Sequence, residues 1–502
     1  MERPSRRFLI LGLDGGTFDL LDPLMEAGEL PFLRSLARRG TRAPLASVFP
    51  PKTIPAWYSF ATGLDPGGLG IFGFTEPDGG PGKSRIVQTF RPAQALWDLL
   101  SRHGRRVGVL NFPLRAGYPI NGFVVPGMLS EDPPTFPADL KEGLKAELGE
   151  AYLPELPAYR ASDRARWMDL ATRGVEQRGR AAKILCDRFA PDFLFVLFRE
   201  TDRIQHQHWA ELAQPHARIG EDLLAFWRGV DAACAQTDRA FREVGGDAVT
   251  LVISDHGHGA AHGDFFTNRW LAREGYLIFR TGAGSFRRRL VSRVLLATDR
   301  FRPTRALLRP VVDRLRGGAR REWVGRLVAG DSSFEEMAGR IDWERTVAFS
   351  YPVPEGIYLN RYNPDLTPEE GERIVGEIRG KLERYPDARV EVFDPRSIYR
   401  GRNLAQAPAL LLRIDGMATE LRMDFSYPEP MLHERPGFFY GTGVHRMNGI
   451  FLAAGDGIGA RRSDTPFSLL DIAPTVLDGM GVPVPPAMAG QALTAHLYGE
   501  AA

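Results

Sequence analysis

The chain has 502 residues, about three times the commonest domain size, so it can hold one large core with an insertion or two to three domains. Hydrophobic residues make up 43% and charged residues 25%, which is close to the globular average and excludes a disordered or fibrous protein. The formal net charge is only +2, no apolar run approaches the roughly 18 residues of a membrane helix, and the two cysteines, Cys186 and Cys234, cannot form a disulfide framework or a cysteine metal cluster. We therefore expect a soluble, cytoplasmic protein without a transmembrane segment.

Short apolar runs alternate with amphipathic helical patterns along most of the chain. This alternation predicts an α/β fold with a doubly wound, mostly parallel sheet and helices on both faces. The predicted strands of this sheet are Phe8–Leu13, Val107–Asn111, Phe193–Phe198, Val249–Ser254 and Ile450–Ala454. The predicted helices include Val175–Phe189 and Glu221–Val244, and a later region adds the strands Val347–Ser350, Ile357–Leu359 and Leu410–Ile414 around a helix at Pro368–Tyr385.

One segment differs in composition from the rest. Residues 280–326 contain 14 arginines and three acidic residues, with Pro303 and Pro310 interrupting the helical pattern. We predict an Arg-rich helical segment within an inserted cap at 280–430, and a catalytic core made of residues 1–279 and 431–502. The arginines could form a solvated helical face, contact an anionic surface or bind an anionic leaving group, but no specific nucleic-acid binding is expected.

Acidic and histidine side chains follow three of the predicted strands. Asp14 comes after the first strand, Asp202 follows Phe193–Phe198 by four residues, and Asp255 with His256 closes the strand at Val249. Ligands of open α/β sheets bind outside the carboxyl ends of the strands, so these groups can converge although they are far apart in sequence. Singly each signal is weak, and Asp14 before two glycines could be only a turn residue.

Further histidines add to this pattern to different degrees. His206 lies one helical turn after Asp202, and His445 lies on a glycine-rich loop ahead of a strand, where ligands are common. His208 is off that helical face, next to Trp209, and is expected to pack. Three further histidines, His258, His262 and His433, have no clear partner, and we expect them on the surface or outside the ligand set.

Thr53 is a candidate nucleophile. It lies between Pro51 and Pro55, at the start of an apolar helical run. A hydroxyl at a helix N-terminus faces free backbone N–H groups, which suit a phosphate, but a threonine needs a metal or a base beside it to attack. In isolation, the segment favours Thr53 as an ordinary N-cap.

Six segments, taken together, are more specific than any one residue. They read ILGLDGGTFDLLDPL, FPPKTIPAWYSFATGLDPGGLGIFGF, ETDRIQHQHW, VISDHGHG, GTGVHRMNGIFLAAGDGI and SLLDIAPTVLDGMGVPVPPAMAGQAL. In this order they resemble the alkaline phosphatase superfamily, and most closely its type I phosphodiesterase/nucleotide pyrophosphatase family, over about residues 8 to 493.

The resemblance implies an alkaline-phosphatase-like fold and a hydrolase of phosphate esters, either a phosphodiesterase or a phosphomonoesterase. It implies two divalent metal ions, zinc before manganese or iron given the mixed oxygen and nitrogen ligands. Thr53 would attack phosphorus and form a phosphothreonine that water then hydrolyses. Carried over by motif, one ion is bound by Asp14, Thr53, Asp255 and His256, and the other by Asp202, His206 and His445.

The sequence departs from the family at one position. Nucleotide pyrophosphatases place a histidine and a phosphate-orienting asparagine around the Gly-Ile pair after the nucleophile, where this chain has Leu69-Gly70-Ile71-Phe72-Gly73-Phe74. Asn111, at the end of a predicted strand, could bind substrate in its place or be a loop residue.

Several alternative functions remain. A phosphosugar mutase or a transferase of phospho-head groups could use the same residues, and a non-catalytic interaction module is a further alternative. A sulfatase would need a Cys or Ser in a C/S-x-P-x-R motif, and neither cysteine has that context.

Overall fold

The computed structural model describes residues 6–80, 83–87, 95–130, 132–280, 338–351, 356–423, 429–433 and 441–498. The predicted Arg-rich segment at 280–326 lies, except for Arg280, outside the described residues. Of the helices within these ranges, none combines the length and the apolar character needed to cross a membrane.

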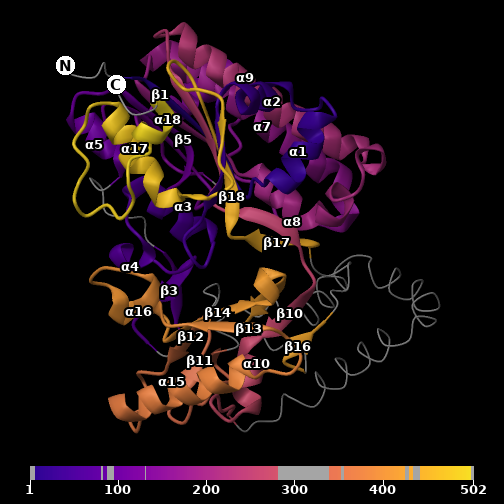
Figure 1. Ribbon diagram of the computed structural model, residues 1–502, viewed down its shortest axis with the longest axis vertical. Coiled ribbons are helices and arrows are strands. Elements are labelled where there is room, and N and C mark those ends of the chain that lie inside the picture. Colours follow the sequence, from indigo (N-terminus) through magenta and orange to yellow (C-terminus); the bar gives the residue numbers. More distant parts are fainter. Residues whose placement is uncertain are drawn as a thin grey trace.

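A nine-stranded, mostly parallel sheet forms the centre of the larger part of the molecule (Figure 1). Its parallel strands β8, β1, β7, β5 and β6 lie side by side, and β18 pairs antiparallel with β8 and β2. The bounds are β1 Phe8–Leu13, β2 Thr41–Ala46, β5 Val107–Pro113, β6 Gly122–Gly127, β7 Phe193–Phe198, β8 Val249–Ile253, β18 Asn448–Ala454, β19 Arg461–Arg462 and β20 Phe467–Ser468.

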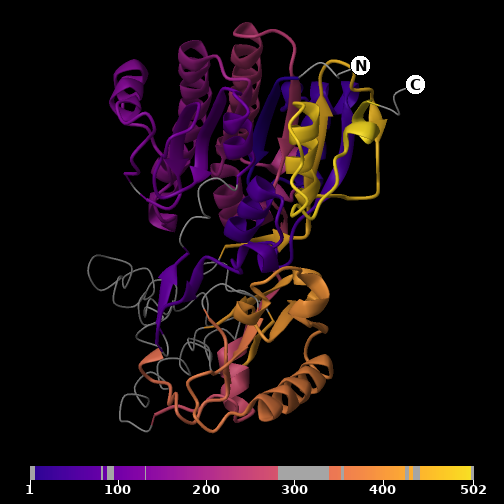
Figure 2. The same ribbon diagram turned by 90° about the vertical axis from the view of Figure 1, so that its left-hand side faces the viewer.

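Helices cover both faces of this sheet, as Figures 1 and 2 show. Alternate side chains of β1 enter two different cores: Leu9, Leu11 and Leu13 pack in one, while Phe8 and Ile10 pack in the other. The first core includes residues of α1 (Phe18–Glu26), α2 (Pro31–Arg39), α6 (Leu140–Leu148), α7 (Arg164–Phe189), α8 (Glu200–Leu212) and α9 (Glu221–Glu243). The second includes α3 (Thr53–Thr62), α5 (Leu96–Arg102), α17 (Ile472–Gly479) and α18 (Thr494–Tyr498). The predicted doubly wound α/β architecture is thus confirmed.

A second sheet forms a smaller unit at the end of the molecule opposite the two termini (Figures 1 and 2). Its strands are β10 Gly263–Phe266, β11 Ala348–Phe349, β12 Gly356–Leu359, β13 Val390–Phe393, β14 Leu410–Ile414, β15 Thr419–Arg422 and β16 Met431–Leu432. Its helices are α10 (Thr267–Arg273), α15 (Pro368–Glu383) and α16 (Pro395–Ile398). Because β10 and β16 belong to this sheet, it takes strands from both sides of the predicted boundaries at 279/280 and 430/431.

Short elements connect the two units. The ribbon of β9 (Gly257–Ala260) and β17 (Gly443–Arg446) lies between them, and α4 (Pro66–Leu69) and the hairpin of β3 (Thr75–Pro77) and β4 (Ser84–Ile86) lie at the same level (Figure 1). The hydroxyl of Tyr399, just after α16, donates to the backbone oxygen of Phe49 at 2.6 Å. The backbone N–H of Arg400 donates to Asp65 at 2.6 Å. The smaller unit is therefore hydrogen-bonded to the loops on both sides of α3.

A buried ion pair fixes the start of α8. The guanidinium of Arg178, on α7, donates to Glu200 at 2.6 Å, and both side chains have at most 1% of their surface exposed. Arg178 also donates to the backbone oxygens of Leu153 at 2.7 Å and Leu197 at 3.3 Å. Since Glu200 is the first residue of α8, the pair ties this helix end to α7 and to strand β7.

Replacing Arg178 by alanine should lower the free energy of unfolding by about 3–5 kcal/mol, because it leaves the Glu200 carboxylate buried without its partner. Urea denaturation followed by circular dichroism measures the change. Arg173→Ala on the same helix is the matched control, since the side chain of Arg173 is 49% exposed, and it should cost at most about 0.5 kcal/mol. Equal losses for the two variants would contradict a stabilising role for the buried pair.

Candidate metal centre

Three carboxylates lie at one edge of the sheet, each just after one of three adjacent strands. Asp14 directly follows β1, Asp255 lies two residues after β8, and Asp202 lies in the first turn of α8, after β7. Because β1 pairs in parallel with both β7 and β8, the carboxyl ends of the three strands lie next to one another. All three carboxylates are at most 3% exposed. The convergence expected from the sequence is present.

The first group of ligand atoms surrounds His256. Its Nε2 lies 3.2 Å from Oδ2 of Asp255, 3.7 Å from Oδ1 of Asp14 and 3.5 Å from the hydroxyl of Thr53. The other carboxylate oxygens are held by the protein: Trp57 donates to Asp14 at 3.1 Å, and the backbone N–H of Gly15 donates to Asp255 at 3.2 Å. One oxygen of each carboxylate is thereby turned toward the His256 ring.

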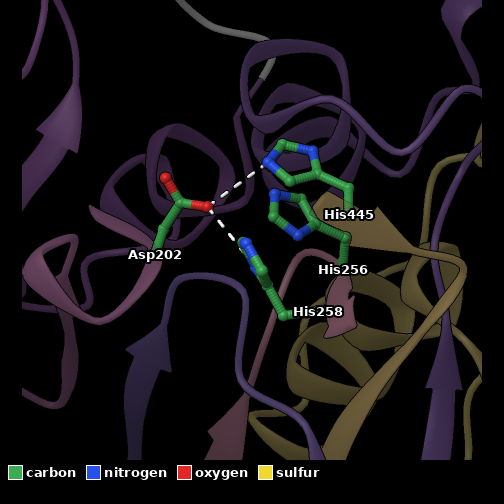
Figure 3. Close-up of side chains that lie close together, drawn as sticks. All are labelled: Asp202, His256, His258 and His445. Carbon is green, nitrogen blue, oxygen red and sulfur yellow. Dashed lines mark ion pairs between the residues drawn. The ribbon is translucent and has the colours of Figure 1, made fainter. Parts of the chain in front are cut away.

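The second group consists of Asp202, His206 and His445. Oδ1 of Asp202 lies 3.3 Å from Nε2 of His206 and 3.3 Å from Nε2 of His445, and the two Nε2 atoms are 2.9 Å apart. The rings of His256 and His445 stack with centroids 3.6 Å apart, which brings the two groups side by side. Figure 3 shows His256 and His445 together, with Asp202 facing His445. The structure thus brings together all seven residues named by the sequence as ligands.

Backbone carbonyls fix the orientation of three imidazoles. Nδ1 of His206 contacts the oxygen of Gly443 at 2.9 Å, Nδ1 of His256 that of Gly257 at 3.1 Å, and Nδ1 of His445 that of Pro51 at 2.7 Å. A carbonyl only accepts, so each Nδ1 carries a proton and Nε2 of each ring faces the cluster. Donation of the other ring N–H to a carbonyl is the usual arrangement of metal-ligating histidines.

The buried carboxylates and imidazoles of this cluster are suited to binding a cation. Burial raises the pKa of Asp14 and of Asp255 well above the usual range, and the negative charge of a neighbouring aspartate raises each further. Burial also acts to raise the pKa of Asp202, but the imidazoles around it, His206 first, hold it well below its usual range. Among the described atoms, Oδ1 of Asp14, Oδ2 of Asp255 and Oδ1 of Asp202 have no hydrogen-bond donor. The Nε2 atoms of His206 and His445 lie 2.9 Å apart. Together with the three carboxylate oxygens that lack a donor, they are potential metal ligands.

Thr53 opens helix α3 and is only 1% exposed. Lys52 occupies the N-cap position, and the hydroxyl of Thr53 points toward His256 instead of capping the helix. The alternative interpretation of Thr53 as an ordinary N-cap is therefore wrong. A hydroxyl at the first helical position is surrounded by the positive end of the helix dipole.

A cavity of about 390 Å³ opens onto Thr53 and the second group of ligands. This volume is typical of sites for small molecules. The larger unit contributes Lys52, Thr53, Arg199, Asp202, Arg203, His206 and His445 to its lining, and the smaller unit contributes residues of β14 and β15, among them Arg413, Thr419 and Glu420. The cavity therefore lies between the two units.

The structure reveals two further residues that the sequence interpretation did not place at the site. His258, expected at the surface or outside the ligand set, is completely buried beside Asp202. Arg199 is 8% exposed and lines the cavity, with Nη1 3.7 Å from Asp202, and its Nε and Nη1 have no hydrogen-bond acceptor in the described part of the chain. A charged residue directly after a buried strand is the sequence signal that could have identified Arg199.

Other residues lie away from the cluster. His208 is buried against Tyr159 and Trp167 and contacts Glu211 at 2.7 Å, as expected of a packing residue. Asn111 is 1% exposed, and its amide donates to the oxygen of Leu197 at 3.3 Å. Asn111 is not among the described residues that line the cavity, so its position does not support a role in binding substrate. His262 and His433 are exposed.

Comparisons with known proteins agree with this geometry. A model of the type I phosphodiesterase/nucleotide pyrophosphatase family matches residues 8–323. The fold is similar to that of a quadruple mutant of the alkaline phosphatase PafA, with a TM-score of 0.54, 14% identity, and coverage of 99% of this chain and 100% of that one. It is also similar to a phosphonoacetate hydrolase from Sinorhizobium meliloti 1021 in complex with phosphonoformate, with a TM-score of 0.55, 16% identity, and coverage of 95% and 97%.

No curated protein matches the chain. The family model, in contrast, covers more than half of the chain. It includes six of the seven predicted ligands, all except His445. On this basis the chain belongs to the type I phosphodiesterase/nucleotide pyrophosphatase family and is a hydrolase of phosphoric ester bonds.

Proposed function

We propose that the chain hydrolyses phosphate mono- or diesters at a centre of two divalent metal ions, with Thr53 as the covalent nucleophile. The observation that carries the proposal is the placement of the Thr53 hydroxyl. It is buried at the start of α3, 3.5 Å from Nε2 of His256, and it lines the same cavity as Asp202, His206 and His445. A threonine hydroxyl has no reactivity of its own at neutral pH, so this surrounding is what makes it a nucleophile.

The two ligand groups differ in chemistry. Asp14, Thr53, Asp255 and His256 offer mainly oxygen, while Asp202, His206 and His445 offer two nitrogens and one oxygen. Both sets suit zinc, and the oxygen-rich set also suits manganese or iron. When bound, the ions lower the pKa of the attacking hydroxyl and neutralise charge on the phosphoryl and leaving oxygens.

The protein residues then define two chemical steps. Oγ1 of Thr53 attacks phosphorus. The Thr53 oxygen–phosphorus bond forms while the bond between phosphorus and the leaving oxygen breaks, and the alcohol departs with a proton. Water next attacks the phosphothreonine, which breaks the Thr53 oxygen–phosphorus bond, restores the hydroxyl and releases the phosphoryl product. Transfer to an alcohol instead of water would make the same site a transferase.

Arg199 supports the binding of an anion in this cavity. The asparagine that nucleotide pyrophosphatases use for the phosphoryl group is missing from Leu69-Gly70-Ile71-Phe72-Gly73-Phe74. The buried guanidinium of Arg199 lines the same cavity, with Nε 3.5 Å from Glu155 and Nη1 3.7 Å from Asp202 but neither nitrogen in a hydrogen bond among the described residues, and it supplies donors and positive charge for phosphoryl oxygens instead. We assign the smaller unit the role of a cap that contacts the organic group of the ester, since β14 and β15 line the cavity.

Metal removal should abolish turnover. The purified protein is expected to contain about two transition-metal ions per chain by mass spectrometry and to cleave p-nitrophenyl phosphate or bis-p-nitrophenyl phosphate. Turnover of a sulfate ester and of a phosphonate, and phosphoryl transfer to an added alcohol, distinguish sulfatase, phosphonatase and transferase activities from phosphate ester hydrolysis. Full activity of the chelator-treated protein would contradict the metal centre, and metal-loaded protein without turnover of any ester would favour an interaction module.

Thr53→Ala should lower kcat by at least about 10³-fold while the metal content stays near two ions, because the substitution removes the attacking oxygen and leaves the six charged or imidazole ligands. Thr62→Ala is the matched control on the same helix, since its hydroxyl donates to the backbone oxygen of Tyr58 at 2.7 Å. Unchanged turnover in Thr53→Ala would remove Thr53 from the chemistry.

Arg199→Met should lower kcat/KM by about 10²–10³-fold, which is the usual effect of losing one charged donor to the transition state. Steady-state kinetics on the best ester of the panel measures the loss, and mass spectrometry should find unchanged metal content. Arg218→Met, at an exposed arginine, controls for the loss of one positive charge. A loss no larger than that of the control would show that Arg199 does not contact the phosphoryl group.

A further inference from the structure

His258 lies inside the metal centre, although it belongs to neither of the two ligand groups implied by the family. It is on strand β9, directly opposite His445 on β17, and none of its surface is exposed. Figure 3 shows its ring turned toward Asp202, with the ring of His256 between it and His445. The β9–β17 ribbon thus presents two histidines to the same carboxylate.

The polar atoms of this ring are unsatisfied. Neither Nδ1 nor Nε2 of His258 has a hydrogen-bond partner among the described residues. Its ring packs edge-to-face on His206 with centroids 4.5 Å apart and stacks on Trp209 with centroids 6.0 Å apart. These contacts pack the ring but give its nitrogens no hydrogen bond. A buried polar atom without a partner is rare, because leaving it unpaired lowers the stability of the fold.

The geometry shows where one of these nitrogens is directed. Nδ1 of His258 lies 3.7 Å from Oδ1 of Asp202, the same oxygen that faces His206 and His445. One ligand atom each from Asp202, His256, His258 and His445 fits within 4.8 Å of the others. His206 adjoins this group, with its ring centroid 4.5 Å from that of His258 and 4.8 Å from that of His445. Gly15 keeps this space open, because a Cβ at its position would lie 2.8 Å from Nδ1 of His258.

We propose that His258 is a further ligand of the ion bound by Asp202, His206 and His445, through Nδ1. This inference rests on the metal centre of the proposed function. It changes the donor set from two imidazoles and a carboxylate to three imidazoles and a carboxylate. Four protein ligands of this kind favour zinc over magnesium or manganese and hold the ion more tightly than three.

Cobalt titration of the 502-residue chain tests the proposal. Co²⁺ reports its ligands through visible absorption, and the wild-type protein is expected to bind two ions. His258→Gln should raise the Kd of one ion at least tenfold and change its absorption bands, while the other ion keeps its Kd. His262→Gln is the matched control, because His262 follows the same strand and is exposed, and it should bind both ions like the wild type. Two ions with wild-type Kd values and bands in His258→Gln would overturn the proposal.

A measurement on the wild-type chain covers the case in which His258→Gln does not fold. In protein loaded with ¹¹³Cd and labelled with ¹⁵N-histidine, scalar coupling to cadmium identifies each coordinated imidazole. Four coupled histidines, with His258 coupled through Nδ1, support the proposal, and coupling limited to His206, His256 and His445 overturns it. A chain that binds no metal at all would instead refute the metal centre of the proposed function.

Discussion

The burial of three carboxylates at one sheet edge is the constraint on which the rest of the site depends. Asp14, Asp202 and Asp255 are at most 3% exposed, and each has an oxygen without a hydrogen-bond donor among the described residues. Removing such groups from water costs several kcal/mol each unless a positive charge or a metal ion compensates. The sheet cannot avoid this cost, because the order β8-β1-β7 places the three strand ends side by side. In the proposed function, a pair of bound cations would offset this cost and would form the catalytic centre.

The surrounding protein orients the other donors toward these oxygens. Carbonyls of Gly257, Gly443 and Pro51 hold the imidazoles of His256, His206 and His445 with Nε2 toward the cluster. Pro51 also belongs to the loop that leads into Thr53, so one hydrogen bond links His445, a candidate metal ligand, to the loop of the candidate nucleophile. The smaller unit supports this loop through Tyr399 and Phe49. The candidate metal ligands, the candidate nucleophile and the smaller unit beside the cavity are therefore connected through a few contacts to the backbone.

Much of the fold could be predicted because its central strands are buried on both faces. The predicted bounds of β1 and β7 agree with the structure, since each is an uninterrupted apolar run. Strand β2 was missed because it alternates buried and half-buried residues and contains Pro44. Helix α7 begins at Arg164 and not at Val175, because Trp167, Met168 and Ala171 extend its buried stripe toward the N-terminus. Motifs located Asp14, Thr53 and His445, but His258 is brought to the site only by the pairing of β9 with β17, which no local pattern records.

Anomalous X-ray diffraction from crystals of the chain grown with zinc tests the central claim most directly. The account predicts two strong zinc peaks next to each other, one between Asp14, Asp255 and His256 with Thr53 beside it, and one between Asp202, His206 and His445. Anomalous density confined to surface histidines, with the three carboxylates still buried and unoccupied, would contradict it.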